Sequence, residues 1–214
     1  MCANFTPARQ AAWDRAIKAI FPVGDFRPEA FPGHVAPIRT NEPRDDGVLA
    51  TFGLLPHWAR PELVRSTYNA RSETAATKPS FRNAWKQGQF CIIPADDIFE
   101  PCYDSGRAVR WRITHRDGAP LDIAGLWESR PVGDGVQYSF SMLTISAAGH
   151  PIMQHMHKPE DEKRMVVILD PDDYADWLAT PPERALGWMR QYPAQWLSAE
   201  LAPRGGSGQA RDDA

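Results

Sequence analysis

The first hydrophobic pattern in the chain is helical. Apolar residues recur at three- to four-residue spacing from Trp13 to Ile20, which predicts an amphipathic helix over residues 7–20. Thr6 is the expected N-cap of this helix, and Pro7 is its expected first residue. Prolines interrupt the next forty residues repeatedly, which predicts loops between short strands.

The middle of the chain has the pattern of a β-sheet. Apolar and polar residues alternate over residues 109–114, as in a strand with one buried face. Glycine turns at 117–118 and 133–135 separate this strand from two further apolar runs, so residues 109–145 are predicted to form an antiparallel meander. The other predicted strands are 47–55, 90–93, which Pro94 is expected to close, and 165–169.

Short helices are predicted around these strands, at residues 79–86 before Gly88, from Asp170 to Leu178, and at 194–201. No alternating series of strands and helices is present. The pattern therefore predicts an α+β fold with flanking helices and an antiparallel central sheet whose closure into a barrel is left open. Residues 1–202 are expected to form a single domain, and 203–214, which lack apolar anchors, a disordered tail.

The composition is that of a globular chain. Hydrophobic residues make up 43% of the 214 residues, and no apolar run approaches the roughly 18 residues that a membrane-spanning helix needs. No signal-peptide pattern opens the sequence, so we expect a cytoplasmic protein. Three cysteines without a C-x-x-C pair predict free thiols, and they argue against a disulfide framework or a structural zinc site.

Charge is distributed unevenly along the chain. The net charge of −3 indicates no nucleic-acid partner by itself. Residues 56–90, however, hold six basic and two acidic residues, with aromatic side chains between them. Such a stretch can bind single-stranded nucleic acid through phosphates and stacked bases, or it can be a solvated face over core aromatics. Taken alone, the stretch favours the second interpretation.

Cys2 carries the most distinctive candidate chemistry. Removal of Met1, which is usual before a small side chain, would give Cys2 a free α-amine beside its thiol. An α-amine has a pKa of about 8, so a useful fraction is neutral at physiological pH. An aldehyde would react with both groups, first as a Schiff base and then as a five-membered thiazolidine. Without further support, the favoured interpretation is that Cys2 is merely the second residue of a frayed terminus.

Further motifs, taken in order, resemble those of the SOS-response-associated peptidase family, also called abasic-site processing proteins. The resemblance covers roughly residues 1–178, and it is specific in combination although each motif is weak alone. Besides Met1-Cys2, the motifs are Gly53-Leu54-Leu55-Pro56 up to Trp58, Asn69-Ala70-Arg71-Ser72-Glu73-Thr74, Cys91-Ile92-Ile93-Pro94-Ala95-Asp96 running to Phe99-Glu100, Ala124-Gly125-Leu126-Trp127-Glu128, and His157 followed by Glu162-Lys163-Arg164-Met165.

The resemblance implies a protein that captures abasic sites in single-stranded DNA. The expected product is a covalent thiazolidine crosslink to Cys2, which protects the lesion during the DNA damage response. An attached peptidase activity is implied, and whether an abasic-site lyase step competes is left open. We expect no cofactor, no metal, no membrane partner, a monomer, and association with the nucleoid when DNA is damaged. Possible replication-fork partners are not identified.

The resemblance assigns catalytic roles to Cys2, Asn69, Glu100 and His157. Glu100 lies beside an apolar strand, where desolvation raises a carboxyl pKa and suits the group to proton transfer. His157 is expected to titrate near neutral pH and to donate a proton to the sugar oxygen or the leaving group. Asn69 is expected to hydrogen-bond the Cys2 amine or the adduct.

Five further residues are predicted to contact DNA. The resemblance assigns flanking phosphates to Arg71 and Arg164, apolar contacts with bases or sugars to Trp58 and Pro37, and a hydrogen bond to a phosphate to Thr144.

The chain departs from the family pattern in three places. Ala3-Asn4 follows Cys2 where Gly-Arg is common, so a basic group is missing there. Pro101-Cys102-Tyr103 follows Glu100 where Trp is frequent. Residues 158–163 separate His157 from Arg164, where the shorter family form has a single residue.

Three alternatives remain at this point. A cysteine peptidase would use Cys2 with His157 and Glu100 as its nucleophile set. A non-catalytic reader would bind single-stranded nucleic acid through residues 56–90. A metal hydrolase would use His155 and His157, but no third ligand lies at a recognisable spacing.

Overall fold

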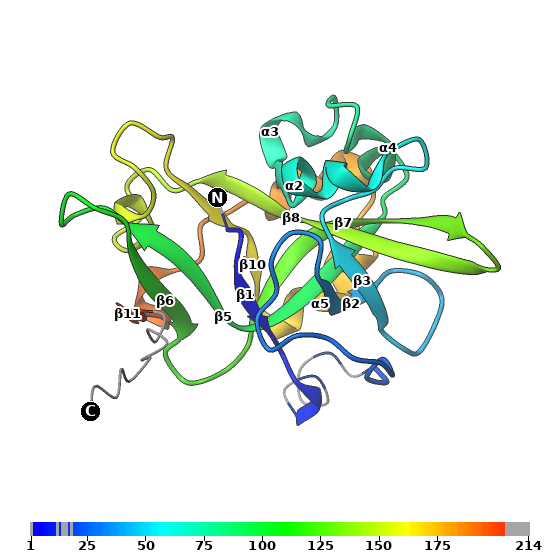
Figure 1. Cartoon of the computed structure of the whole chain (residues 1–214), viewed down its shortest axis with the longest axis horizontal. Coiled ribbons are helices and arrows are strands. Elements are labelled where there is room, and N and C mark those ends of the chain that lie inside the picture. Colours follow the sequence, from blue (N-terminus) through cyan, green and yellow to red (C-terminus); the bar gives the residue numbers. More distant parts are fainter. Residues whose placement is uncertain (1, 12, 14–16, 18, 204–214) are drawn as a thin grey trace, which may run out of the picture.

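A closed barrel of five strands forms the centre of the molecule (Figure 1). The computed structural model describes residues 2–11, 13, 17 and 19–203. The barrel strands are β2 (Val35–Thr40), β3 (Val48–Phe52), β5 (Phe90–Cys102), β7 (Leu121–Val132) and β8 (Gly135–Ser146).

The strands of the barrel are paired in the order β7-β8-β3-β2-β5, and β5 pairs again with β7 to close the ring. The pairing of β3 with β8 is parallel, whereas the other pairings in the ring are antiparallel. The predicted α+β fold with a barrel-like sheet is therefore confirmed, and the sheet is mixed rather than purely antiparallel.

Shorter strands extend the barrel at several places. Among them, β4 pairs in parallel with β8, and β1 pairs antiparallel with β5. These strands are β1 (Phe5–Pro7), β4 (Asn69–Arg71), β6 (Val109–His115), β9 (Arg164–Val166), β10 (Ile168–Leu169) and β11 (Leu197–Leu201).

The helices are short and lie outside the barrel (Figure 1). They are the 3-10 helices η1 (Pro61–Leu63), η2 (Met153–His155), η3 (Pro171–Asp173), η4 (Pro182–Trp188) and η5 (Ala194–Trp196), and the α-helices α2 (Val64–Thr67), α3 (Ser72–Ala75), α4 (Arg82–Lys86) and α5 (Tyr174–Leu178). No helix in the described part of the chain is long and apolar enough to cross a membrane.

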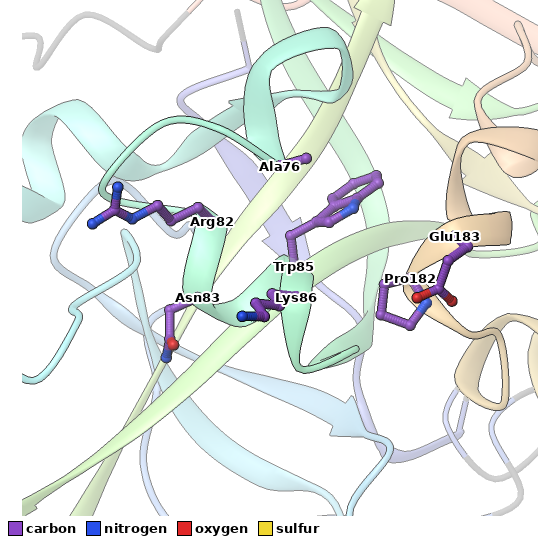
Figure 2. Close-up of a pocket in the computed structure, with 7 residues that line it drawn as sticks. All are labelled: Ala76, Arg82, Asn83, Trp85, Lys86, Pro182 and Glu183. Atoms are coloured by element: carbon purple, nitrogen blue, oxygen red, sulfur yellow. The ribbon is translucent and has the colours of Figure 1, made fainter.

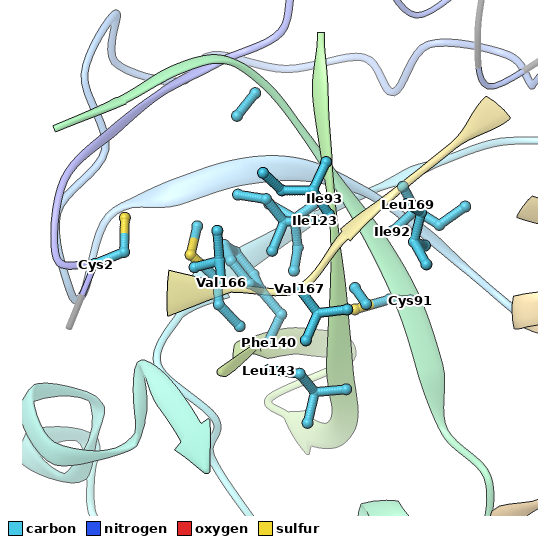
Figure 3. Packing of buried hydrophobic residues seen from close by; sticks show 14 of the residues in the cluster. Cys2, Cys91, Ile92, Ile93, Ile123, Phe140, Leu143, Val166, Val167 and Leu169 are labelled. Atoms are coloured by element: carbon cyan, nitrogen blue, oxygen red, sulfur yellow. The ribbon is translucent and has the colours of Figure 1, made fainter. Parts of the chain in front are cut away.

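Aromatic rings and branched aliphatic side chains fill the barrel. Phe52 and Phe140 stack with their centroids 5.1 Å apart, and Phe5 meets Phe52 edge-on at 5.3 Å. Apolar residues from β5, β7, β8 and β9 continue this core (Figure 3). Cys2, Cys91 and Cys102 are buried free thiols, as predicted.

Several predicted elements are confirmed, and two predicted ends are wrong. The strand at 47–55, the meander over 109–145 and the helix that ends before Gly88 are present as β3, as β6 to β8 and as α4. Residues 197–201, predicted as part of a helix, form strand β11, because the edge of β6 supplies antiparallel partners from His115 to Trp111.

The strand that was expected to end at Pro94 continues to Cys102. Proline removes one backbone donor, so it is tolerated where strand pairing is already irregular. Pro94 lies beside the register shift between Thr6 and Pro7 of β1, and its carbonyl accepts a hydrogen bond from the amide of Ala8. The long β5 carries Glu100, so this continuation decides where the carboxylate lies.

The predicted N-terminal helix begins later than expected. Thr6 and Pro7 belong to β1, where Thr6 pairs with Asp97 of β5 instead of capping a helix. The amide of Trp13 donates to the carbonyl of Arg9, which is a helical hydrogen bond. Residues 12, 14–16 and 18 of the predicted helix, and the predicted tail from residue 204 onward, lie outside the described residues.

Candidate active site

The four predicted catalytic residues come from distant parts of the sequence and meet at one place. Cys2 precedes β1, Asn69 opens β4, Glu100 lies in β5, and His157 follows η2. All four are buried, with Cys2 only 1% and Glu100 only 2% exposed. Figure 3 shows Cys2 at the margin of the packed core.

Direct contacts join these side chains. Asn69 Nδ2 donates to the carbonyl of Cys2 at 2.6 Å. The Cys2 thiol donates to the carbonyl of Asn4 at 3.6 Å and is also in hydrogen-bonding contact with Glu100. His157 Nε2 lies 3.4 Å from Glu100 Oε2. The start of the chain is therefore surrounded by an amide, a carboxyl group and an imidazole.

Strand pairing explains why Cys2 lies beside Glu100. Phe5 of β1 is in register with Ile98 of β5, and the amide of Phe99 donates to the carbonyl of Asn4 at 2.9 Å. These bonds fix the first residues along β5, so the terminus follows the strand toward Glu100. Asn69 reaches the same point because β4 pairs with β8.

A left-handed backbone conformation places His157. Its φ of 66° is uncommon for a residue other than glycine and is typical of positions constrained by their surroundings. Its amide donates to the carbonyl of Pro101 at 2.6 Å. Lys163 Nζ donates to three carbonyl oxygens, those of Met156, His157 and Lys158. Lys163 therefore holds the inserted loop, and the ring remains near Glu100.

Burial separates the proton affinities of Glu100 and His157. Desolvation raises the pKa of Glu100 to about 7, as the sequence predicted for this position. Desolvation lowers the pKa of His157 to about 4. The expectation that His157 titrates near neutral pH is therefore wrong in this environment. Near neutral pH Glu100 is divided between its protonated and ionised forms, and His157 is a neutral imidazole.

The thiol of Cys2 is held in its protonated form. Burial and the nearby Glu100 carboxylate both raise its pKa well above the ordinary value. A reactive cysteine thiolate needs the opposite, an environment that lowers the thiol pKa. Sulfur must therefore lose its proton as its new bond forms, because no preformed thiolate is favoured at this position.

One buried acceptor in this site, Asn69 Oδ1, has no hydrogen-bond donor among the described residues, whereas Glu100 Oε2 has the 3.4 Å contact with His157 Nε2. Buried polar atoms without partners are uncommon, because each costs the desolvation of the group. Asn69 contacts Cys2, so its Oδ1 atom is available to an amine or a hydroxyl group at that point.

The predicted DNA contacts divide into exposed and buried residues. Trp58 is 56% exposed, and Arg71 is exposed on the surface next to Asn69. Pro37 is buried in β2, where it pairs with Leu49 of β3. Thr144 is buried as well and donates to the carbonyl of Ala70. Contacts of Pro37 and Thr144 with DNA remain predictions that this conformation does not support.

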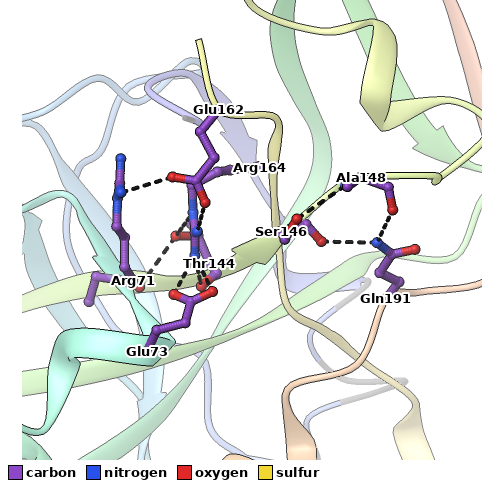
Figure 4. A network of polar contacts seen from close by, with 9 residues as sticks. Arg71, Glu73, Thr144, Ser146, Ala148, Glu162, Arg164 and Gln191 are labelled. Atoms are coloured by element: carbon purple, nitrogen blue, oxygen red, sulfur yellow. Dashed lines mark hydrogen bonds and ion pairs between the residues drawn. The ribbon is translucent and has the colours of Figure 1, made fainter.

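Arg164 lies in a polar network rather than on the surface (Figure 4). Its side chain is 1% exposed, and it donates to the carbonyl and the hydroxyl of Thr144. Glu73 lies 2.8 Å and Glu162 2.6 Å from the same guanidinium. Glu162 also pairs with Arg71 at 2.8 Å. A phosphate contact by Arg164 remains a prediction, but its donors face protein oxygens here.

The structure of residues 56–90 agrees in part with both interpretations of this stretch, as a nucleic-acid-binding surface and as a solvated face over core aromatics. Phe81 and Trp85 are core residues, whereas Trp58 is exposed. The six basic side chains all belong to exposed residues: Arg60, Arg65, Arg71, Lys78, Arg82 and Lys86.

A cavity of about 570 Å³ adjoins part of this stretch (Figure 2). Its walls include Arg82 and Lys86 of α4 and, across the opening, Pro182 and Glu183 of η4. It shares no lining residue with the Cys2 cluster. Across the described residues, no three His, Cys, Asp or Glu side chains are grouped so as to hold a metal ion.

A family model described as SOS response associated peptidase (SRAP) matches residues 1–202. The chain belongs to the SRAP family. The match spans almost the whole described chain, including every residue of the Cys2 cluster.

Two named relatives of this SRAP protein come from bacteria. Abasic site processing protein YoaM of Bacillus subtilis is 29% identical, over 93% of this chain and 89% of that protein. Abasic site processing protein YedK of Escherichia coli is 28% identical, over 69% of this chain and 56% of that protein.

A solved structure shares the fold closely. A crystal structure of a protein from Bordetella bronchiseptica superposes with a TM-score of 0.87 at 36% identity, covering 95% of this chain and all of that one. A protein from Bacteroides thetaiotaomicron superposes with a TM-score of 0.78 at 20% identity, covering 94% and 91%, and indicates the fold alone.

The structure adds residues to this SRAP site that the sequence did not single out. The Tyr68 phenol is half-buried, and its pKa is raised by desolvation and by Glu100 and Cys2. Arg110 of β6 donates to Asn4 Oδ1 at 2.8 Å and lies over the Phe99 ring at 3.4 Å. A guanidinium thus stands beside Asn4, where the family pattern commonly has arginine in the chain itself. The position of Tyr68 before Asn69 was an available signal, whereas the approach of β6 was not.

Proposed function

We propose that this protein captures abasic sites in single-stranded DNA through a covalent bond to Cys2, after removal of Met1. The observation that carries the proposal is the gathering of Asn69, Glu100 and His157 around the second residue of the chain. The names of the relatives YoaM and YedK, both abasic site processing proteins, support the same substrate.

The chemistry begins with the opening of the deoxyribose ring. An abasic sugar exchanges between a closed hemiacetal and an open aldehyde, and opening moves a proton from the hydroxyl group to the ring oxygen. Protonated Glu100 can supply a proton near neutral pH, and neutral His157 can accept one. The 3.4 Å contact between the two side chains lets the proton return to Glu100.

The bond to the lesion then forms in two steps. The α-amine attacks the aldehyde carbon, and the resulting hydroxyl group takes up a proton and leaves as water, which gives an imine. The thiol sulfur adds to the imine carbon while the thiol proton passes to nitrogen, and this closes the thiazolidine. The product contains protein and sugar less one molecule of water. Because the pKa of the thiol is raised, the transfer of its proton must accompany the formation of the sulfur–carbon bond.

Asn69 keeps the reacting residue in place. Its amide nitrogen binds the Cys2 carbonyl, and its Oδ1 atom remains free of donors within the described residues. We infer that Oδ1 accepts a hydrogen bond from the newly exposed amine, which orients the nitrogen lone pair toward the aldehyde.

Two substitutions of Cys2 test the proposal. Wild-type protein should give an adduct with an abasic oligonucleotide that survives a denaturing gel without reduction. Cys2→Ser keeps the amine but not the thiol, so we expect an adduct only after borohydride trapping. Cys102→Ser, at another buried free cysteine, is the matched control and should behave as wild type. A gel-stable adduct from Cys2→Ala, or activity with Met1 retained, contradicts the proposal.

The peptidase alternative is less well supported. A cysteine peptidase needs a thiolate activated by a base, whereas burial and Glu100 keep the Cys2 thiol protonated. Peptide turnover without a DNA adduct would reverse this ranking.

A further inference from the structure

The inserted loop at residues 158–163 brings an acidic group to the predicted phosphate contact. Its carboxylate, on Glu162, lies 2.8 Å from Arg71 and 2.6 Å from Arg164 (Figure 4). One carboxylate from this loop therefore bridges the two arginines.

We propose that Glu162 occupies the position of a DNA phosphate and limits the affinity of Arg71 for the strand. The inference rests on the proposed function, because it takes Arg71 as a phosphate contact. Carboxylate and phosphate oxygens bind a guanidinium in the same way, through charge-assisted hydrogen bonds. A phosphate that approaches Arg71 therefore competes with Glu162 for the same guanidinium.

The charges of the network support competition. Arg71 and Arg164 carry two positive charges, and Glu73 and Glu162 carry two negative charges, so the group is neutral as it stands. A phosphate that approaches this neutral group gains little attraction until one carboxylate moves away.

The exposure of the pairs shows which contact can open. Arg71 and Glu162 are 43% and 46% exposed, so water and salt weaken their attraction. Arg164 is buried, but Glu73 and Thr144 still bind it when Glu162 leaves. Release of Glu162 thus leaves Arg164 paired and frees Arg71 for the strand.

Lys163 limits how far the loop can move. Its Nζ atom holds the carbonyls of Met156, His157 and Lys158. The Glu162 side chain can therefore swing from Arg71 while the backbone that carries His157 stays in place. We infer that exchange at Arg71 does not disturb the catalytic pair.

The test measures affinity without the covalent step. The probe is single-stranded DNA containing tetrahydrofuran, an abasic analogue with no aldehyde, so failure of the crosslinking chemistry does not affect the result. We expect Glu162→Gln to bind about two- to fivefold more tightly than wild type, as expected for the loss of one exposed ion pair. Glu160→Gln removes the same charge from an exposed position on the same loop and should change affinity less.

A double-mutant cycle isolates the contact. In an Arg71→Gln background, Glu162→Gln should give no gain, because the contact that it frees is absent. An equal gain in both backgrounds would mean a general charge effect and would overturn the proposal. Weaker binding by Glu162→Gln would overturn it too, since Glu162 would then be holding Arg71 ready for DNA.

A second variant keeps the charge. Glu162→Asp retains a carboxylate near Arg164 but is one methylene shorter, so it cannot span both arginines as before. We expect tighter binding by this variant as well, at unchanged thermal stability. Wild-type affinity from a folded Glu162→Asp protein would contradict the bridging role.

Discussion

Glu100 and His157 show how burial can set the direction of proton transfer between two side chains. An imidazole beside a carboxylate in water would hold the proton, because the ordinary pKa of histidine is the higher of the two. Desolvation disfavours both charged forms and reverses this order here, with a pKa of about 7 for Glu100 and about 4 for His157. The carboxyl group is consequently the acid of the pair at neutral pH.

Replacing Glu100 by glutamine should slow adduct formation on an abasic oligonucleotide by about 100-fold, because general acid catalysis commonly contributes this much. Single-turnover rates on denaturing gels measure the effect. Glu128→Gln is the matched control, since Glu128 is also buried and has a raised pKa but lies against Asn83. Equal rates for wild type and Glu100→Gln would exclude the acid role.

Glu100→Gln should also change how the free energy of unfolding depends on pH. The folded pKa of Glu100 exceeds its unfolded value of 4.5, so the folded state keeps a proton that the unfolded chain releases. The stability contributed by this group is therefore present below pH 4.5 and is lost as the pH rises to about 7. Relative to wild type, Glu100→Gln should gain on the order of 3 kcal/mol between pH 4 and pH 8, measured by denaturant unfolding.

At the scale of elements, the strands of the barrel were the most predictable part of the fold. The alternation over 109–114 and the turns near Gly118 and Gly133 are local signals, and they gave β6, β7 and β8. The helix predicted over residues 197–201 was wrong because these residues pair with β6, which lies more than eighty residues earlier in the chain. The strand end predicted at Pro94 was wrong because the strand tolerates this proline beside the irregular pairing of β1. Local patterns cannot report such partners.

The candidate site shows the same contrast between local sequence signals and contacts that depend on the fold. The motifs supplied Cys2, Asn69, Glu100 and His157, and these residues do lie together. The low pKa of His157 and the burial of Arg164 depend on how the loop at 158–163 folds back onto the barrel. No motif encodes that arrangement.

Gly125 of β7 should be intolerant of a side chain. A methyl group there would lie 2.4 Å from Ile93 Cδ1, 2.8 Å from the carbonyl oxygen of Ser141 and 2.9 Å from Cys91 Sγ. Two of these neighbours belong to β5 and one to β8, so the barrel strands would have to separate. We expect Gly125→Ala to destabilise the protein by about 1–3 kcal/mol in denaturant unfolding.

Gly135, the first residue of β8, provides the comparison for that substitution. A methyl group there would meet only the carbonyl of Val132, at 3.8 Å, so Gly135→Ala should be nearly neutral. Equal losses from both variants would show that backbone freedom rather than barrel packing decides the effect.

Across the whole molecule, the barrel brings the four predicted catalytic residues and a basic surface to the same region of the folded protein. Asn69 and Arg71 are two residues apart in β4, with Asn69 buried against Cys2 and Arg71 exposed. Under the proposed function, a strand whose lesion enters the Cys2 site would therefore pass close to Arg71. The acidic net charge of −3 does not oppose this, because binding responds to the local charge of the face.

The salt dependence of binding follows from this placement. A basic residue that neutralises one phosphate of a single strand contributes about 0.7 to 1 to the slope of log affinity against log salt concentration. Arg71→Gln should reduce the slope by that amount and weaken binding similarly for all flanking sequences. Fluorescence anisotropy with tetrahydrofuran oligonucleotides at several salt concentrations measures both quantities.

Arg190 offers a control with the same change of charge. It is an exposed arginine, paired with Asp173, and it lies outside the 56–90 stretch. Arg190→Gln should leave the slope unchanged, because only residues that displace counterions from the strand affect it. If Arg71→Gln also left the slope unchanged, Arg71 would have no phosphate contact, and the strand would have to reach Cys2 across a different face.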